Sequence, residues 1–161
     1  MTNNVSIIVQ NEKSVLIHFF VLISGKWVLD KSSSIKVDSN NISSTDGNII
    51  FINQVQKEEV LVVSIGFKQS ILKVGISSED SVFEIEEQVD SSGIIRVGLE
   101  ESNINKVLRA IYQRGVKHVR LCLLNSIYNS KHEKSISNLL HVAGYKVAKS
   151  GDDYAKSIKK P

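Results

Sequence analysis

The sequence predicts an α/β fold in which a strand-rich N-terminal half precedes a β-α-β-α-β half. From Val5 to Leu99, short β-branched runs are separated by turn residues, a pattern that indicates strands. After residue 100, apolar residues recur every three or four positions in two segments, as on the buried face of a helix. Strands that alternate with helices favour parallel pairing through right-handed crossovers. An α+β arrangement is the alternative.

The N-terminal half holds a series of short candidate strands. They are Val5–Val9, Ser14–Ser24, Trp27–Asp30, Asn48–Gln54, Val60–Ile65, Ile71–Ile76, Val82–Glu86 and Ile94–Leu99. Residues 31–48 interrupt this series with a run that is nearly all Ser, Asn, Asp and Lys. Clusters of these residues are typical of loops, so we expect a long surface loop there with at most one edge strand.

The C-terminal half holds two candidate helices. The first has Ser102 as its cap and ends at Gly115, and its apolar residues share one face at helical spacing. The second begins with the pattern Ser130-x-x-Glu133, a capping box in which each side chain satisfies the other residue's free backbone N–H. The expected strands of this half are Val116–Leu124 and Tyr145–Lys149.

These elements predict a single domain over residues 1–150. Residues 1–57 make a β-hairpin layer that includes the loop 31–48, and residues 60–150 make the α/β part. The last residues, 151–161, are rich in lysine, so we expect a basic tail that frays at the chain end.

Composition and charge limit the classes of function. The chain is 42% hydrophobic and 23% charged, which is typical of a globular domain, and its net charge of +3 is too small to indicate a surface that coats nucleic acid or membranes. The one cysteine, Cys122, excludes an intrachain disulfide and fits a reducing compartment. The longest apolar run, Val15–Ile23, is far shorter than the ~20 residues of a transmembrane helix, and the polar residues before it are not typical of a secretory signal. We therefore expect an uncleaved cytoplasmic protein.

The histidines and the cysteine form no catalytic or metal-binding pattern. His118 and Cys122 lie ~13 Å apart on one strand at a rise of ~3.3 Å per residue, so the imidazole cannot activate the thiol, and we expect Cys122 to pack in the core. His132 and His141 lie nine residues apart on one helix and do not share a face. The sequence therefore predicts no catalytic residue, no metal site and no bound cofactor.

The segment from Ser64 to Ile76 has the pattern of a strand, a tight turn at Gly66 and a second strand. It resembles the first phosphate hairpin of the actin-like ATPase and sugar-kinase superfamily. That resemblance implies that Ser64, Gly66 and Lys68 lie near a bound phosphate. Ser64 stands where the superfamily has its metal-organising aspartate, which leaves Mg²⁺-dependent chemistry without its usual ligand. An ordinary β-hairpin is the alternative interpretation.

A second resemblance is longer and covers residues 89–142. Its segments are Val89-Asp-Ser-Ser-Gly93, Gly115-Val-Lys-His-Val-Arg-Leu-Cys-Leu-Leu-Asn-Ser126 and Lys131-His132-Glu133. This stretch resembles the N-terminal region of hydantoinase/oxoprolinase-type enzymes, which have an actin-like fold. The resemblance implies an actin-like or ribonuclease-H-like subdomain, and it transfers no catalytic residue to this chain.

The sequence leaves three functions open. The first is a non-catalytic protein-interaction or assembly module, a component of a larger complex that binds a protein partner or a second copy of itself. The absence of a catalytic pattern favours it over an enzyme. The second is a nucleotide-binding or hydrolytic domain of actin-like or ribonuclease-H-like type that uses Ser64, Gly66 and Lys68. The third is a nucleic-acid-binding accessory protein in which these basic side chains share one surface: Arg96, Arg109, Arg114, Lys117, Arg120 and Lys131.

Overall fold

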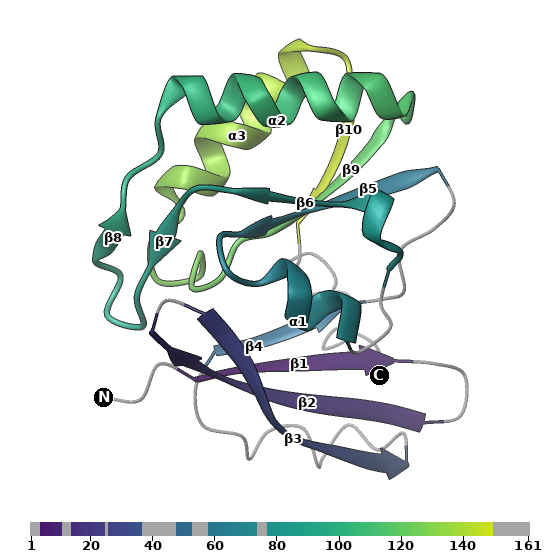
Figure 1. The fold of residues 1–161 in the computed structure, drawn as a ribbon, viewed down its shortest axis with the longest axis vertical. Helices are drawn as coiled ribbons and strands as arrows, with labels where there is room; N and C mark the ends of the chain where they lie inside the picture. Colours follow the sequence, from purple (N-terminus) through teal and green to yellow (C-terminus); the bar gives the residue numbers. More distant parts are fainter. Residues whose placement is uncertain are drawn as a thin grey trace, which may run out of the picture.

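The computed structural model describes residues 4–10, 14–24, 26–36, 48–52, 58–73 and 77–149. In these residues one short helix lies between two four-stranded sheets, and two longer helices cover the far side of the second sheet (Figure 1). The predicted α/β class is therefore confirmed. The predicted tail, 151–161, lies outside the described residues, and the single domain predicted over residues 1–150 stays a prediction.

The first sheet contains the N-terminal strands. Its members are β1 (Asn4–Gln10), β2 (Ser14–Ile23), β3 (Lys26–Lys36) and β4 (Asn48–Ile52), in the spatial order β3-β2-β1-β4. β1, β2 and β3 form an antiparallel meander, and β4 pairs parallel with β1. β3 lies at the edge and includes residues 31–36. Residues 31–36 of the predicted loop 31–48 therefore belong to an edge strand, and residues 37–47 lie outside the described part.

The second sheet is built from parallel strands. Its members are β5 (Glu59–Ser64), β6 (Val82–Ile85), β9 (His118–Cys122) and β10 (Lys146–Lys149), in the order β10-β9-β5-β6. Every neighbouring pair in this order runs parallel. β5 is buried along its whole length, as expected for an inner strand whose two faces are both covered.

One predicted member of the parallel series lies elsewhere. The strand expected over Ile94–Leu99 is β8 (Ile95–Val97), and it pairs antiparallel with β7 (Gln88–Val89) in a hairpin that projects beyond the second sheet (Figure 1). Only the turn 90–94 separates the two strands, whereas a parallel connection needs a dozen or more residues. The hairpin is therefore an insertion between β6 and the helix that follows.

Helices cover both faces of the second sheet. α2 (Glu101–Arg114) and α3 (Lys131–Val142) lie on one face, and α1 (Lys68–Lys73) lies on the other face, toward the first sheet (Figure 1). A short 3₁₀ helix, η2 (Glu79–Ser81), precedes β6. The core on the α2 and α3 side consists of Val60, Val62, Ile85, Ile104, Ile111, Val119, Leu121, Leu123, Ile136 and Leu140.

The prediction of a second hairpin strand after Gly66 is wrong, because residues 68–73 form the helix α1. The turn at Gly66, with φ of 82°, is closed by a bond from the Phe67 N–H to the Ser64 carbonyl. Phe67 and Ile71 are both fully buried, and their spacing places them on one side of a helical turn. The apolar run from Ile71 is too short for its period to separate strand from helix. Residues 74–76 lie outside the described part.

The helix ends agree only in part with their expected capping residues. α2 begins at Glu101, because the Glu100 carbonyl accepts the first helical N–H groups, so the predicted Ser102 cap is wrong. Ser130 does precede α3, but its side chain makes no capping bond, and the Glu133 carboxylate lies 4.0 Å from the Lys149 ammonium. The capping box is therefore wrong. Gly115 ends α2 with φ of 76°, as predicted.

Asp90 organises the turn of the β7–β8 hairpin. Its carboxylate accepts the backbone N–H groups of Ser92 (2.9 Å) and Ile94 (3.0 Å) and the Nε–H of Arg96 (2.7 Å). These bonds, above all the one from Ile94, hold the pKa of Asp90 below its ordinary value. Gly93 completes the turn with φ of 82°, a conformation that costs glycine least.

Replacing Gly93 with alanine is expected to destabilise the protein by about 1–3 kcal/mol. A Cβ at this position would lie 2.8 Å from the Tyr128 carbonyl oxygen, and the positive φ adds strain. Gly98→Ala is the matched control, because a Cβ there meets nothing within 4 Å. Urea unfolding of both variants measures the difference, and equal stabilities would contradict the close contact.

Candidate functional site

The second sheet changes its direction of winding between β5 and β9. β5 connects to β6 through α1 on one face, whereas β9 connects to β10 through α3 on the other face (Figure 1). The carboxyl ends of these two adjacent strands therefore form a topological switch point. In open α/β sheets, ligands bind outside the strand ends at such a point.

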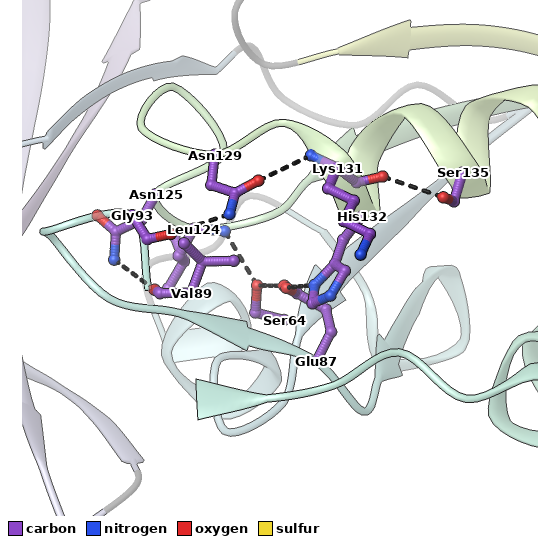
Figure 2. Close-up of polar contacts among 10 residues, drawn as sticks. All are labelled: Ser64, Glu87, Val89, Gly93, Leu124, Asn125, Asn129, Lys131, His132 and Ser135. Carbon is purple, nitrogen blue, oxygen red and sulfur yellow. Dashed lines mark hydrogen bonds and ion pairs between the residues drawn. The ribbon is translucent and has the colours of Figure 1, made fainter. Parts of the chain in front are cut away.

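A buried polar network occupies this place (Figure 2). The Ser64 hydroxyl, at the end of β5, donates to Glu87 Oε1 and accepts the backbone N–H of Leu124 at 2.9 Å. The other oxygen of Glu87, Oε2, lies 2.8 Å from Nδ1 of His132 in the first turn of α3. The network therefore joins β5, the segment after β6, the segment after β9 and the start of α3.

Burial governs the electrostatics of the network. The Glu87 side chain is fully buried, and the His132 side chain is only 6% exposed. Loss of hydration raises the pKa of Glu87 above its ordinary value, although the hydrogen bonds from His132 and Ser64 oppose the shift. Glu133, a second carboxylate close by, adds to the rise. Glu87 therefore binds its proton more tightly than an exposed glutamate does.

The order of the three side chains does not suit nucleophilic catalysis. A serine nucleophile needs a base within hydrogen-bond reach and a third group that orients the base. Here the carboxylate lies between the serine and the histidine, and Ser64 is only 1% exposed. The network joins the strand ends, and its order of groups is not that of an activated serine nucleophile.

Two asparagine side chains extend the network to the β7–β8 hairpin (Figure 2). Asn125 donates through Nδ2 to the Val89 carbonyl at 2.8 Å, and Asn129 donates to the Gly93 carbonyl at 2.9 Å. Asn125 has a positive φ of 66°, which asparagine tolerates better than most residues. The hairpin is therefore attached to the segment 123–130 by side-chain bonds.

A pocket of about 430 Å³ lies beside β6, the edge strand of the second sheet. Lys68 and Lys106 line it together with Glu84, Glu86 and Asn103. Glu84 Oε2 accepts the backbone N–H of Lys68 at 2.9 Å, and Glu86 Oε2 accepts Nδ2 of Asn103 at 2.9 Å. Its apolar walls are Ile65, Val82, Phe83, Val107 and Ala110.

The structure separates the three residues predicted to lie near a phosphate. Ser64 belongs to the buried network, Gly66 forms the turn, and Lys68 lines the pocket. The backbone N–H of Lys68 is already bonded to the Glu84 carboxylate. The phosphate-binding role of these residues stays a prediction.

Sequence reasoning missed Glu87, His132 and Lys106. Glu87 belongs to a run of acids with Glu84 and Glu86, which is equally typical of a solvent-facing side of a strand, and His132 lies within the Ser130-x-x-Glu133 pattern that predicted a capping box. The available signal was the Lys131-His132-Glu133 segment of the family resemblance. It contained the histidine but gave no partner for it.

Several basic residues of the proposed nucleic-acid surface have carboxylate partners. Arg120 is buried and lies 3.0 Å from Glu59 on the neighbouring strand. Arg96 bonds to Asp90, and Arg114 lies 3.7 Å from Asp80. Burial withdraws Arg120 from such a surface, and the carboxylates partly neutralise Arg96 and Arg114.

Three further findings concern Cys122, metal binding and membrane-spanning helices. Cys122 is fully buried, which confirms that it packs in the core. Within the described ranges, no group of three His, Cys, Asp or Glu residues is arranged to hold a metal ion. No helix in this part of the chain is long and apolar enough to cross a membrane.

The fold and the site define a doubly wound α/β unit with a closed polar switch point. The chain belongs to the family described as the hydantoinase/oxoprolinase N-terminal region, which it matches over residues 30–144. The predicted resemblance to this family is therefore confirmed. Among curated proteins, no sequence matches the chain significantly.

Two solved structures share the fold. Nucleotide-free acetone carboxylase, described as carrying out ATP-dependent acetone carboxylation, aligns with a TM-score of 0.51 at 12% identity over 94% of this chain and 30% of that chain. The ATP-dependent caprolactamase from Pseudomonas jessenii aligns with a TM-score of 0.51 at 15% identity over 90% of this chain and 28% of that chain. The chain thus spans less than a third of either enzyme subunit. Together with membership of the family, the likeness supports the predicted fold of actin-like or ribonuclease-H-like type.

The Glu87→Gln variant is expected to reveal the raised pKa of Glu87. Between the ordinary value of 4.5 and the higher value in the folded protein, the folded state binds more protons than the unfolded state. The contribution of Glu87 to stability is therefore present below pH 4.5 and is lost as the pH rises through the folded-state pKa. Glutamine mimics the protonated acid and has no such dependence.

Urea unfolding of the wild type and of Glu87→Gln, from pH 4.5 upward at constant ionic strength, measures this effect. The stability of the wild type should fall relative to that of the variant as the pH rises. The opposite trend would mean that the His132 contact dominates and that the pKa of Glu87 is lowered.

Proposed function

We propose that this chain is the nucleotide-binding N-terminal region of an ATP-dependent hydrolase or carboxylase, and that the pocket beside β6 binds the phosphates of a Mg²⁺–nucleotide. Membership of the hydantoinase/oxoprolinase family and the likeness to two enzymes described as ATP-dependent support the enzyme class. Together they favour the nucleotide-binding alternative over a non-catalytic module. The observation that carries the proposed site is that two lysines and two glutamates line one pocket.

The lysines fit the negative charge of a polyphosphate. Lys68 is half-buried and Lys106 is exposed, and both residues line the pocket. Neither ammonium forms an ion pair with the described residues. Charge-assisted bonds from lysine to phosphate are stronger than neutral hydrogen bonds. The two side chains come from α1 and α2, so they would hold the ligand from opposite sides of β6.

The glutamates fit a magnesium ion that accompanies the phosphates. Each carboxylate uses Oε2 in a bond to a neighbouring N–H, and Oε1 has no partner among the described residues. Mg²⁺ is usually bound through one or two carboxylates together with substrate phosphates. When bound, it would neutralise charge on the phosphate oxygens. Glu84 and Glu86 would hold it, and the apolar walls at Phe83 and Val107 would cover the base.

In this proposal Ser64 has a supporting role. Its hydroxyl is buried between Glu87 and the Leu124 N–H, so it fixes the end of β5 from which the turn at Gly66 begins. Gly66 permits that turn, and the turn directs Lys68 to the pocket. Of the three residues predicted near a phosphate, Lys68 would make the contact.

Thermal unfolding with ATP and Mg²⁺ tests the proposal. A ligand at a hundredfold excess over its dissociation constant adds about 2.7 kcal/mol to stability, so the unfolding midpoint of the wild type should rise. Lys68→Ala and Lys106→Ala should each weaken binding about tenfold, the loss expected for one bond to a charged group. Lys134→Ala, an exposed lysine on α3, is the matched control and should bind as the wild type does.

Parallel titrations with ATP lacking Mg²⁺ separate the role of the glutamates from that of the lysines. A midpoint that does not respond to ATP and Mg²⁺, or that responds equally in the Lys68→Ala/Lys106→Ala double variant, would overturn the assignment of this pocket.

Our second proposal is that the chain binds a protein partner. We also propose that it acts in the cytoplasm. A groove between α2 and the residues that follow α3, lined by Leu108, the exposed Tyr112 and Tyr145 among others, supports a protein-binding surface. The two proposals are compatible, because the β6 pocket and this groove lie on opposite flanks of α2.

A further inference from the structure

Two contacts fix the direction of the pocket beside β6. Near one end, Glu86 Oε2 accepts Nδ2 of Asn103, in the first turn of α2, at 2.9 Å. Beyond the other end, Nη2 of Arg114, in the last turn of α2, donates to the Ser81 hydroxyl, just before β6 begins, at 3.4 Å. β6 and α2 therefore run beside the pocket in opposite directions (Figure 1).

The chemical character of the pocket changes along this direction. The charged and amide side chains of β6 and α2 lie toward the Glu86 end, and they are Glu84, Glu86, Asn103 and Lys106. The apolar side chains lie toward the Arg114 end, and they are Val82, Phe83 and Ala110. Ala110 is about 10 Å from Asn103 along the axis of α2, and Phe83 is about 10 Å from Glu86 along the strand direction. The pocket thus has a charged half and an apolar half.

Arg114 and Asp80 form a charged pair beyond the apolar half. Arg114 lies four residues after Ala110, on the same side of α2. Its Nη2 is 3.7 Å from Asp80 Oδ2, and the Ser78 hydroxyl donates to Asp80 Oδ1 at 2.7 Å. The Ser78 bond above all, and the charge of Arg114, hold the pKa of Asp80 below its ordinary value. The pair therefore offers guanidinium donors beside an ionised carboxylate acceptor.

We propose that Arg114 and Asp80 bind the edge of the nucleotide base, and that the phosphates lie at the opposite, Glu86 end of the pocket. This inference rests on the proposed nucleotide site and adds the recognition of the base to it. The flat faces of the base would lie in the apolar half, beside Phe83 and Ala110.

The order of parts in the pocket matches the order of parts in a nucleotide. Anionic phosphates meet the charged half, the faces of the base meet the apolar half, and the edge of the base meets the Arg114–Asp80 pair. Adenine presents an amino donor beside a ring-nitrogen acceptor, which is the complement of a carboxylate beside a guanidinium. The reverse orientation would place the phosphates against Val82 and Ala110 and beside the carboxylate of Asp80.

Inorganic tripolyphosphate is the probe that separates the base from the phosphates. Titration calorimetry in the presence of Mg²⁺ measures its affinity and that of ATP, and the wild type should bind ATP more tightly. Arg114→Ala should weaken ATP binding about tenfold, the loss expected for one bond to a charged group, and leave tripolyphosphate binding unchanged. Arg114 lies about 16 Å from Asn103 along α2, which exceeds the Debye length of about 8 Å at physiological ionic strength.

Two further variants sharpen the measurement. Arg109→Ala is the matched control, because Arg109 is an exposed arginine of the same helix that lines the groove on the other flank, and it should bind both ligands as the wild type does. Asp80→Asn removes the charged acceptor and should weaken the binding of ATP alone. Binding of tripolyphosphate by each variant shows that the variant is folded.

The results distinguish a failure of this inference from a failure of the site. An Arg114→Ala variant that loses affinity for both ligands alike would place the phosphates at Arg114 and overturn the proposed orientation. A variant that binds ATP as tightly as the wild type does would overturn the contact with the base. A wild type that binds neither ligand would overturn the nucleotide site, and this inference with it.

Discussion

The carboxylate of Glu87 is the group on which the arrangement of the second sheet's carboxyl edge depends. A buried acid is costly unless its oxygens are hydrogen-bonded, and here each oxygen has one partner from a different part of the chain. Ser64 comes from the end of β5, and His132 comes from the first turn of α3. The hydroxyl of Ser64 is also the acceptor for the Leu124 N–H. Displacing any one of these segments would leave a buried polar group without its partner.

The buried bonds of Glu87 also restrict the edge strand of the second sheet. Glu86 immediately precedes Glu87 in the chain and Glu84 lies three residues before it, so the anchoring of Glu87 limits where this segment of backbone lies. On the other side, Asn125 and Asn129 follow Leu124 and attach the β7–β8 hairpin. A single buried centre therefore positions both the pocket beside β6 and the projecting hairpin. Networks of this kind specify one arrangement because a partly satisfied version is unfavourable.

The sequence predicted the parts of the fold whose apolar pattern is long. The two helices after residue 100, the strand that becomes β9 and the parallel pairing of β9 with β10 agree with the structure. The family resemblance, based on segments near Val89, Gly115 and Lys131, also agrees. In the two helices and in β9, many residues contribute to one periodic pattern. A local error at one position does not change the outcome.

The sequence did not predict α1 or the polar network, for two physical reasons. The apolar residues around Ile71 are too few to show a period, and burial of Phe67 against the core decides the local structure. Glu87 and His132 lie 45 residues apart in the chain, so their contact depends on the folded sheet. Glu133 is a second case in which a distant contact decides the structure. It lies near Lys149 on β10 and does not form the predicted local bond to Ser130.

The buried thiol of Cys122 can report when the second sheet opens. The thiol lies at the end of β9, between β5 and β10, and no part of it is exposed. A thiol reagent can reach the sulfur only when the sheet separates or the chain unfolds, so the labelling rate follows the population of open molecules. Because the described residues contain no other cysteine, this rate reports on one strand. The stability of the second sheet is thereby measurable with a thiol reagent under native conditions, without denaturant and without an engineered cysteine.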